Sequence, residues 1–170
     1  MSRLFDSGLP LGDALFRWWK ALEDNRADRS ELRRCEDLLQ VMQTPAFQRI
    51  RRQLLEMGLR PRDSERDRLA AVIGLVACVS STADPALHRD LPRLAEAFSD
   101  GDKPSVSPLR FRQLLDARTD DELFTRLRRV LPLVKERVNL FELANDVFYW
   151  GDSVRRRWVY DYRWPAKESA

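Results

Sequence analysis

Apolar residues recur at spacings of three and four along almost the whole chain, and no segment alternates apolar and polar residues with a period of two. Side chains three or four positions apart lie on one face of a helix, so this pattern is typical of amphipathic helices. The sequence therefore predicts an all-α fold. We expect a two-lobed helical bundle with a long connecting loop near residues 99–107.

The first apolar stripe ends at the polar run EDNRAD, which closes a predicted first helix. Asp28 then precedes Glu31 by three positions, a capping-box spacing that predicts the start of a second helix. The stripe of the first helix consists of Leu11, Leu15, Trp18, Trp19 and Leu22. The buried face of the second helix is expected to consist of Leu32, Cys35, Leu38, Leu39 and Met42.

Thr44 followed by Pro45 predicts a third helix, because threonine caps a helix and proline is tolerated at its first position. Gly58 is expected to end it. A fourth helix opens at Asp63 or Ser64 and continues into LAAVIGLVACV, which is apolar on nearly all sides and should form the buried centre of the first lobe. After Asp90-Leu91-Pro92, a short helix is expected to run to about Phe98.

The run SDGDKPSVSP combines serine, aspartate, glycine and proline, the residues that favour turns and loops. It is the best linker signal in the sequence. We therefore expect an N-terminal helical lobe over residues 1–98 and a C-terminal helical lobe over residues 108–170, joined by a linker at 99–107.

Three further helix starts are predicted beyond this loop. They are Ser107-Pro108, the capping pair of Thr119 with Glu122, and the pair of Asn139 with Glu142. Pro132 should kink or end the middle helix. The last helix is expected to carry a stripe of Leu143, Val147, Trp150, Val154 and Trp158. Burial is expected in particular for Leu75, Val76, Leu127 and Leu143.

Composition adds a bias in the choice of basic residue. The chain has 170 residues, of which 44% are hydrophobic and 34% charged, and its net charge is only +3. Of its 30 basic residues, 26 are arginine. Guanidinium groups match phosphate oxygens in pairs and stack on bases and aromatic rings, so this bias favours a nucleic-acid partner. A GC-rich genome would produce the same bias, and both explanations stay open.

The cysteines and the apolar segments predict a cytoplasmic protein without a membrane span. Cys35 and Cys78 lie in apolar helical stretches without a nearby second cysteine, which indicates buried thiols in a reducing compartment. The N-terminus lacks the pattern of a signal peptide, and the longest apolar stretch, residues 69–79, is too short to cross a bilayer.

The residue types that enzymes use are scarce. His88 is the only histidine, and the six glycines form neither of the usual nucleotide-binding loops. Glu142 and Asp146 are four positions apart and could hold Mg²⁺, but no third acidic ligand is placed near them, so solvated carboxylates are the favoured interpretation. The sequence predicts no catalytic residues, no metal and no cofactor.

Arginines recur instead on the outer faces of consecutive predicted helices, within RSELRRC, RFRQLL and TRLRRVL. Such clusters could form a basic stripe that follows a phosphate backbone, or they could be ordinary solvated helix surface. No recognition-helix pattern is present, so any binding would be directed to the shape and backbone of the nucleic acid.

The order of the motifs resembles the CasB family, the small subunit of the type I-E CRISPR surveillance complex called Cascade. The resemblance covers residues 11–163 and rests on FRWWKALEDNRADRSELRRC, TPAFQRI, LAAVIGLVACV, RFRQLLDARTDDELFTRLRRVLPLV and NLFELANDVFYWGDSVRRRWVYDY. It implies a non-catalytic, all-helical subunit in antiviral defence. Two copies would lie end to end against the other Cascade subunits and help to hold the hybrid of guide RNA and target DNA and the displaced DNA strand, the R-loop. Sequence would then be recognised by base pairing.

The resemblance also implies which arginines face nucleic acid. They are Arg33 or Arg34, Arg110, Arg112, Arg128, Arg129, Arg155 and Arg156. The aromatic residues Trp150, Trp158 and Tyr162 fall on the apolar stripe, so they are expected in the core rather than stacked on bases.

Two other function classes use similar residues. A helical DNA-binding transcriptional regulator would need one helix exposed for the major groove, usually in a symmetric dimer. A pure protein-interaction module would use the arginines as contacts at the rim of an interface, without salt-sensitive nucleic-acid binding. Footprinting of the isolated protein tests the first alternative, and binding across a salt series tests the second.

Overall fold

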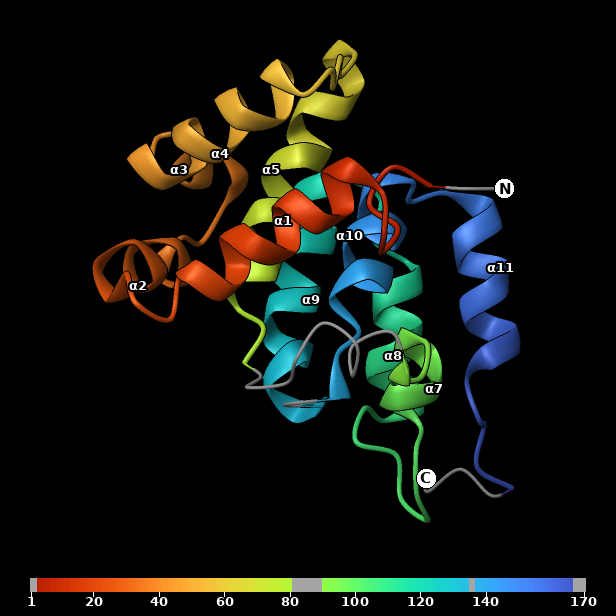
Figure 1. Cartoon of the computed structure of the whole chain (residues 1–170). Coiled ribbons are helices and arrows are strands. Elements are labelled where there is room, and N and C mark those ends of the chain that lie inside the picture. Colours follow the sequence, from red (N-terminus) through yellow and green to blue (C-terminus); the bar gives the residue numbers. More distant parts are fainter. Residues whose placement is uncertain (1–2, 81–89, 135–136, 167–170) are drawn as a thin grey trace.

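The computed structural model describes residues 3–80, 90–134 and 137–166 (Figure 1). Every regular element within these ranges is a helix and none is a strand, which confirms the all-α prediction. The helices are α1 Pro10–Ala21, α2 Arg26–Arg34, α3 Leu38–Met42, α4 Pro45–Glu56, α5 Asp63–Ala77, α7 Leu94–Phe98, α8 Pro108–Leu115, α9 Asp120–Val134, α10 Leu140–Phe148 and α11 Asp152–Asp161.

The second helix begins earlier than its predicted cap. Asn25 is the N-cap of α2, and its side chain accepts the backbone N–H of Asp28 at 3.3 Å. The Asp28 carboxylate in turn accepts a hydrogen bond from the Asn25 amide at 2.7 Å. The prediction that Asp28 caps the helix is therefore wrong by three residues, because asparagine caps as well as aspartate and leaves the acidic residue in the first turn.

The prediction of a single helix that continues through Met42 is also wrong. The backbone of Cys35 is extended, with φ −65° and ψ 129°, and it ends α2. Asp37 then caps a separate short helix, α3, by accepting the backbone N–H of Gln40 at 2.8 Å. This change of direction leaves Leu39 65% exposed instead of buried.

The remaining helix starts are confirmed. The side chains of Thr44, Ser107 and Asn139 accept the backbone N–H groups three positions ahead, at 3.1, 3.3 and 3.2 Å. Thr119 does the same for Glu122, at 3.1 Å. The helix that follows, α9, continues to Val134 past Pro132, so the proline does not end it.

The predicted last helix is two helices. The α-helical backbone stops at Phe148 and resumes at Asp152, whose carboxylate is favourable in the first turn of α11. Trp150, between the two helices, is still only 5% exposed. The apolar spacing therefore continues across the interruption, and this is why the sequence pattern could not reveal the break.

The core is built around α5, which passes through the middle of the molecule (Figure 1) and packs against α2, α3, α9 and α10. All residues from Leu69 to Ala77 are buried, as the apolar run predicted. Gly74 allows α9 to approach closely, since a Cβ at this position would lie 2.7 Å from the ring of Phe124. Burial is confirmed for the four residues named for it, Leu75, Val76, Leu127 and Leu143, each 0% exposed.

The loop after α7 packs onto Tyr162, the residue that follows α11. Val106 is buried, and its carbonyl accepts a hydrogen bond from the Tyr162 hydroxyl at 2.6 Å. α7 itself packs against α11. Buried side chains from before and after the loop belong to one apolar cluster. The division into lobes at residues 99–107 stays a prediction.

Both cysteines are free thiols, Cys35 buried and Cys78 half-buried. Each donates to a backbone carbonyl one turn earlier in the chain, Glu31 and Gly74. Among the described residues, no helix combines the length and the apolar character needed to span a membrane.

Candidate nucleic-acid interface

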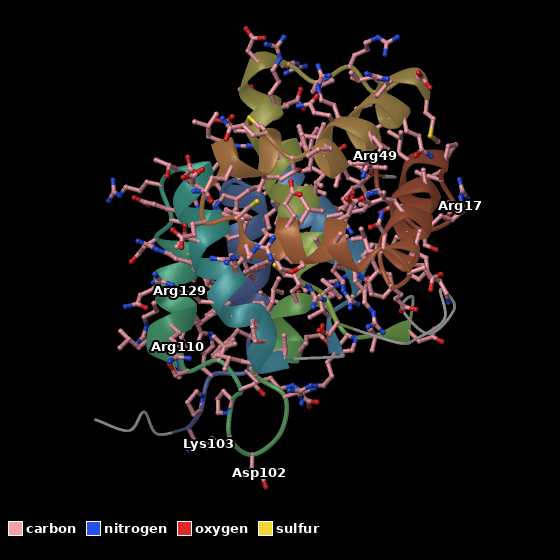
Figure 2. The ribbon with its side chains drawn as sticks, turned by 90° about the vertical axis from the view of Figure 1, so that its left-hand side faces the viewer. Arg17, Arg49, Asp102, Lys103, Arg110 and Arg129 are labelled. Carbon is pink, nitrogen blue, oxygen red and sulfur yellow. The ribbon has the colours of Figure 1, made fainter. Side chains whose placement is uncertain are left out.

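Two neighbouring hollows on one side of the molecule are lined by arginines from α2, α8 and α9. Arg129 lines both of them and so connects them into one surface. Figure 2 shows Arg129 and Arg110 close together on this side. We call the five arginines of these hollows the arginine band: Arg33, Arg110, Arg126, Arg128 and Arg129.

The described residues that line the hollows include no carboxylate. The first hollow is completed by Cys78, Ser80, Leu131 and Pro132, and the second by Gln113, Leu114 and Val130. Within the described lining, the arginines are therefore accompanied by polar and apolar groups and not by acidic ones. Such a surface attracts anions.

Arg33 is fixed against the end of α5. Its Nε donates to the carbonyl of Ala77 at 2.8 Å, and Nη2 lies 3.5 Å from the carbonyl of Val79. A cation at this position stabilises the negative end of the helix dipole and satisfies carbonyls that have no partner within the helix. Burial lowers the pKa of the Arg33 guanidinium, and the charge of Arg29 lowers it further.

Arg128 has the same role for α2. Its Nη2 donates to the carbonyl of Arg33, the second-last residue of α2, at 2.7 Å. Burial raises the pKa values of the Cys78 and Cys35 thiols, and this effect exceeds the opposing effect of the nearby Arg128 charge. Both thiols therefore remain protonated at neutral pH, which argues against a nucleophilic role.

Arg110 and Arg129 are the available cations of the band. Both are exposed, and neither guanidinium forms a hydrogen bond or ion pair with any residue that the structure describes. Arg126, which lines the same hollow, donates to the carbonyl of Gln113 and lies 3.9 Å from a Glu122 carboxylate oxygen. Arg126 was not among the predicted site residues, although it precedes Arg129 by one turn of the same helix.

The other predicted arginines do not line these hollows. The guanidinium of Arg34 donates to the Ser30 hydroxyl at 3.0 Å, and that of Arg112 lies 5.2 Å from the centre of the Trp164 ring. Arg155 donates to the carbonyl of Ala117 at 3.0 Å and pairs with Asp152 at 3.2 Å. Arg156 lies on the exposed face of α11, where its side chain forms no hydrogen bond or ion pair with another described residue.

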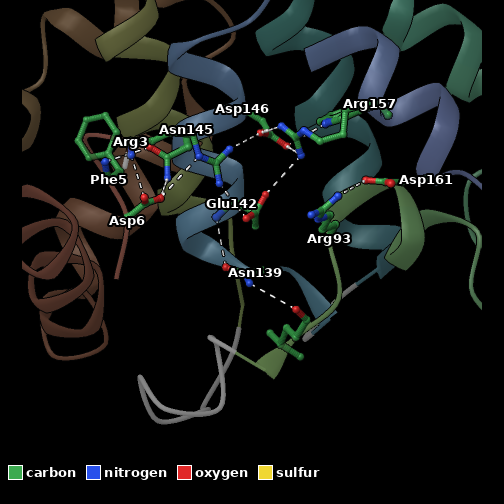
Figure 3. A network of polar contacts seen from close by, with 12 residues as sticks. Arg3, Phe5, Asp6, Arg93, Asn139, Glu142, Asn145, Asp146, Arg157 and Asp161 are labelled. Carbon is green, nitrogen blue, oxygen red and sulfur yellow. Dashed lines mark hydrogen bonds and ion pairs between the residues drawn. The ribbon is translucent and has the colours of Figure 1, made fainter. Parts of the chain in front are cut away.

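The carboxylates of Glu142 and Asp146 bind arginines instead of being free in solvent, contrary to the prediction. Asp146 is 0% exposed, and Figure 3 shows it between Arg3 and Arg157. Its carboxylate accepts from Arg3 Nη1 at 3.0 Å, from the Trp158 indole at 2.8 Å and from both terminal nitrogens of Arg157. Glu142 accepts from Arg3 Nη2 at 2.8 Å.

In this network the two carboxylates neutralise the charges of Arg3 and Arg157. Burial by itself lowers the pKa of Arg157, but its hydrogen bond to Asp146 and the charges of both carboxylates outweigh burial and raise that pKa. Within the described ranges, no group of three or more histidine, cysteine, aspartate or glutamate side chains is arranged to hold a metal ion. His88 lies outside the described residues.

The aromatic residues expected in the core are found there. Trp150, Trp158 and Tyr162 are 5%, 1% and 3% exposed. Trp158 packs edge to face against Trp150 and Phe98, with ring centroids 5.0 and 5.5 Å apart. Their role in packing is confirmed.

Comparison with models of known protein families identifies the family of this chain. The sequence model of the family described as CRISPR-associated protein Cse2 matches residues 28–162. The chain belongs to this family. No curated protein and no solved structure gives a match. The resemblance to the CasB small subunit is thereby confirmed, and membership of the Cse2 family makes the chain a subunit of CRISPR Cascade. The matched span includes the whole arginine band.

Proposed function

We propose that this Cse2-family protein is a non-catalytic Cascade subunit in antiviral defence whose arginine band binds the phosphate backbone of nucleic acid without sequence preference. Through this binding it stabilises the hybrid of guide RNA and target DNA together with the displaced strand. The partners we propose are the other Cascade subunits, a second copy of the chain, guide RNA and target DNA.

One observation carries this proposal: the exposed guanidinium groups of Arg110 and Arg129 have no partner among the described residues, and the described lining of the hollows beside them lacks carboxylates. Arginines that had only a structural role would be expected to bind acidic or carbonyl groups of the chain, as Arg33 and Arg128 do. Unpaired guanidinium groups on one surface fit phosphate oxygens bidentately.

A backbone contact is sufficient for this function because base pairing reads the target sequence. The exchange of DNA duplex for RNA–DNA hybrid is nearly balanced, so a few phosphate contacts alter its equilibrium appreciably. We therefore expect the band to affect R-loop yield more than it affects the assembly of the complex.

The test compares reconstituted Cascade carrying Arg110→Ala and Arg129→Ala with the wild-type complex. Subunit content is measured by native mass spectrometry, and R-loop formation by the reactivity of the displaced strand to a single-strand probe. We expect a lower R-loop yield with unchanged subunit content. For the isolated protein on duplex DNA, the slope of log affinity against log salt should become shallower by about 0.9 for each phosphate that the variant no longer neutralises.

The matched control is a double variant, Arg17→Ala and Arg51→Ala. Both arginines are exposed, form no side-chain hydrogen bond or ion pair with another described residue, and lie outside the band; Figure 2 shows Arg17 across the molecule from Arg110 and Arg129. This variant removes the same charge and should form R-loops normally. Equal R-loop yields in the two double variants would contradict the proposal and favour a pure protein-interaction module. Loss of assembly in the band variant would also contradict it, since the band would then be a subunit interface.

A further inference from the structure

The outer face of α11 combines an exposed aromatic ring with unpaired positive charge. Val154 and Trp158 are buried on its inner face, 6% and 1% exposed. The opposite face carries Arg156 and, one turn later, Tyr160, which is 90% exposed and so the most exposed of the large apolar and aromatic residues described. Figure 1 shows α11 at the edge of the molecule.

The acidic residues of α11 are already paired, so the face is positive. Asp152 pairs with Arg155 at 3.2 Å, and Asp161 with Arg93 at 3.4 Å. The side chain of Arg163, just after the helix, is 69% exposed, and its ion pair with Asp100 is long, at 4.0 Å. A cation thus lies on each side of Tyr160 along the chain.

The helix that carries this ring is held firmly from inside. Trp158 packs against three rings and donates its indole N–H to the buried carboxylate of Asp146. Tyr162 stacks on Phe111 with 4.1 Å between ring centroids. Because tyrosine has only two rotatable side-chain bonds, a ring presented by such a helix loses little entropy when it binds a partner.

We propose that this face binds single-stranded nucleic acid, with a base stacked on Tyr160 and neighbouring phosphates bound by Arg156 and Arg163. The inference rests on the proposed function and deepens it by assigning unpaired strands to α11. Cations that follow the backbone, together with aromatic rings on which bases stack, are what sequence-tolerant single-strand binding requires. Because both carboxylates of α11 are already engaged by arginines, the face favours an anionic partner over an ordinary protein surface.

The experiment measures binding of the full-length protein by fluorescence anisotropy, at low salt, to two labelled oligonucleotides of equal length. One is oligothymidine, and the other is an abasic strand with the same phosphates but no bases. Tyr160→Ala should weaken binding to oligothymidine by about 5- to 150-fold, the range that corresponds to one stacked base. It should leave binding to the abasic strand unchanged.

Three further variants isolate the contribution of the ring. Tyr160→Phe keeps the ring and should bind both strands normally. Val159→Ala alters a neighbouring residue that is 42% exposed and should do the same. Arg156→Ala should weaken binding to both strands equally, because it removes a phosphate contact and no stacking.

The outcomes separate this inference from the proposed function. If Tyr160→Ala has no effect on oligothymidine binding while Arg110→Ala with Arg129→Ala reduces it, the stacking proposal fails and the arginine band remains supported. If Tyr160→Ala reduces Cascade assembly without affecting either strand, the face binds protein and the inference is overturned. If the wild-type protein binds neither strand, both proposals fail.

Discussion

The arginines of two regions of this protein have different surroundings. In the network of α10 and α11, Arg3 and Arg157 bind the half-buried carboxylate of Glu142 and the buried carboxylate of Asp146 (Figure 3). In the arginine band, Arg33 and Arg128 bind main-chain carbonyls at helix ends, while Arg110 and Arg129 have no partner among the described residues. The comparison shows that the groups around an arginine, rather than the number of arginines, decide whether its charge is already paired.

The network joins three parts of the chain. Arg3 comes from the N-terminal segment, the carboxylates from α10 and Arg157 from α11. The same segment is held by Phe5, whose N–H donates to Asn145 Oδ1 at 3.0 Å and whose ring packs against Phe148. The network therefore links the N-terminal segment to α10 and α11, whereas Arg110 and Arg129 of the band have no partner among the described residues.

The largest expected effect is on stability, from Asp146→Asn. The variant removes the charge that two guanidinium groups share, while the amide can still accept from Trp158. Breaking a buried ion pair costs about 3–5 kcal/mol, and we expect the lower end because Arg3 and Arg157 are 30% and 27% exposed. Urea unfolding measures the decrease in stability. Asp152→Asn, at a side chain that is 82% exposed, should change the stability by less than about 0.5 kcal/mol. A decrease below about 1 kcal/mol for Asp146→Asn would show that the network is not a stabilising feature.

Gly12→Ala tests how closely the N-terminal segment must approach α1. A Cβ at this position would lie 2.6 Å from the carbonyl oxygen of Phe5 and would also clash with that of Asp6. The backbone must then move away and weaken the contacts of Arg3. We expect a decrease in stability of about 1–3 kcal/mol, measured by thermal unfolding. Gly58→Ala is unsuitable as a control because Gly58 has φ +107°, where any other residue is strained. The control is instead Ala21→Gly, at the exposed C-terminal end of α1. Full stability in Gly12→Ala would mean that the segment is not tightly packed.

Two single variants within the band sharpen the comparison further. Arg128→Ala leaves the carbonyl of Arg33 without its hydrogen bond and should cost about 1–3 kcal/mol. Arg129→Ala removes no hydrogen bond or ion pair to a described residue and should change the stability by less than about 0.5 kcal/mol. Chemical unfolding measures the stability of both variants. The affinity of both for DNA, measured across a salt series, is expected to fall. Equal decreases in stability would show that Arg129 also has a structural partner.

The smallest expected effect is the pH dependence that the cysteines produce. Burial raises the pKa of both thiols in the folded state. Above about pH 8.5, the usual thiol pKa, the unfolded chain ionises before the folded one does. The free energy of unfolding should therefore fall as pH rises through this range, until the folded pKa is passed. The double variant Cys35→Ala and Cys78→Ala should show a shallower fall between about pH 8 and about pH 10. Identical pH profiles would contradict the expected stabilisation of the protonated thiols.

The local elements of this protein could be predicted from its sequence. Thr44, Ser107, Thr119 and Asn139 cap helices as expected, because a cap depends on side chains and amides only three positions apart. The burial of the apolar run in α5 likewise follows from its composition. The errors in these helix boundaries were also local: Asn25 replaced Asp28 as a cap, and apolar spacing continued across the break before α11.

Only the tertiary structure decided which charges are available. Arg3 binds Asp146 across 143 positions of sequence, Arg128 binds the carbonyl of Arg33 across 95, and Arg33 reaches the end of α5 across 44. The residues next to Arg3, Arg33 and Arg128 in the sequence do not distinguish these arginines from Arg129. Their partners are brought near by the packing of whole helices, and the energy of a charge depends on the groups and the solvent that surround it after folding.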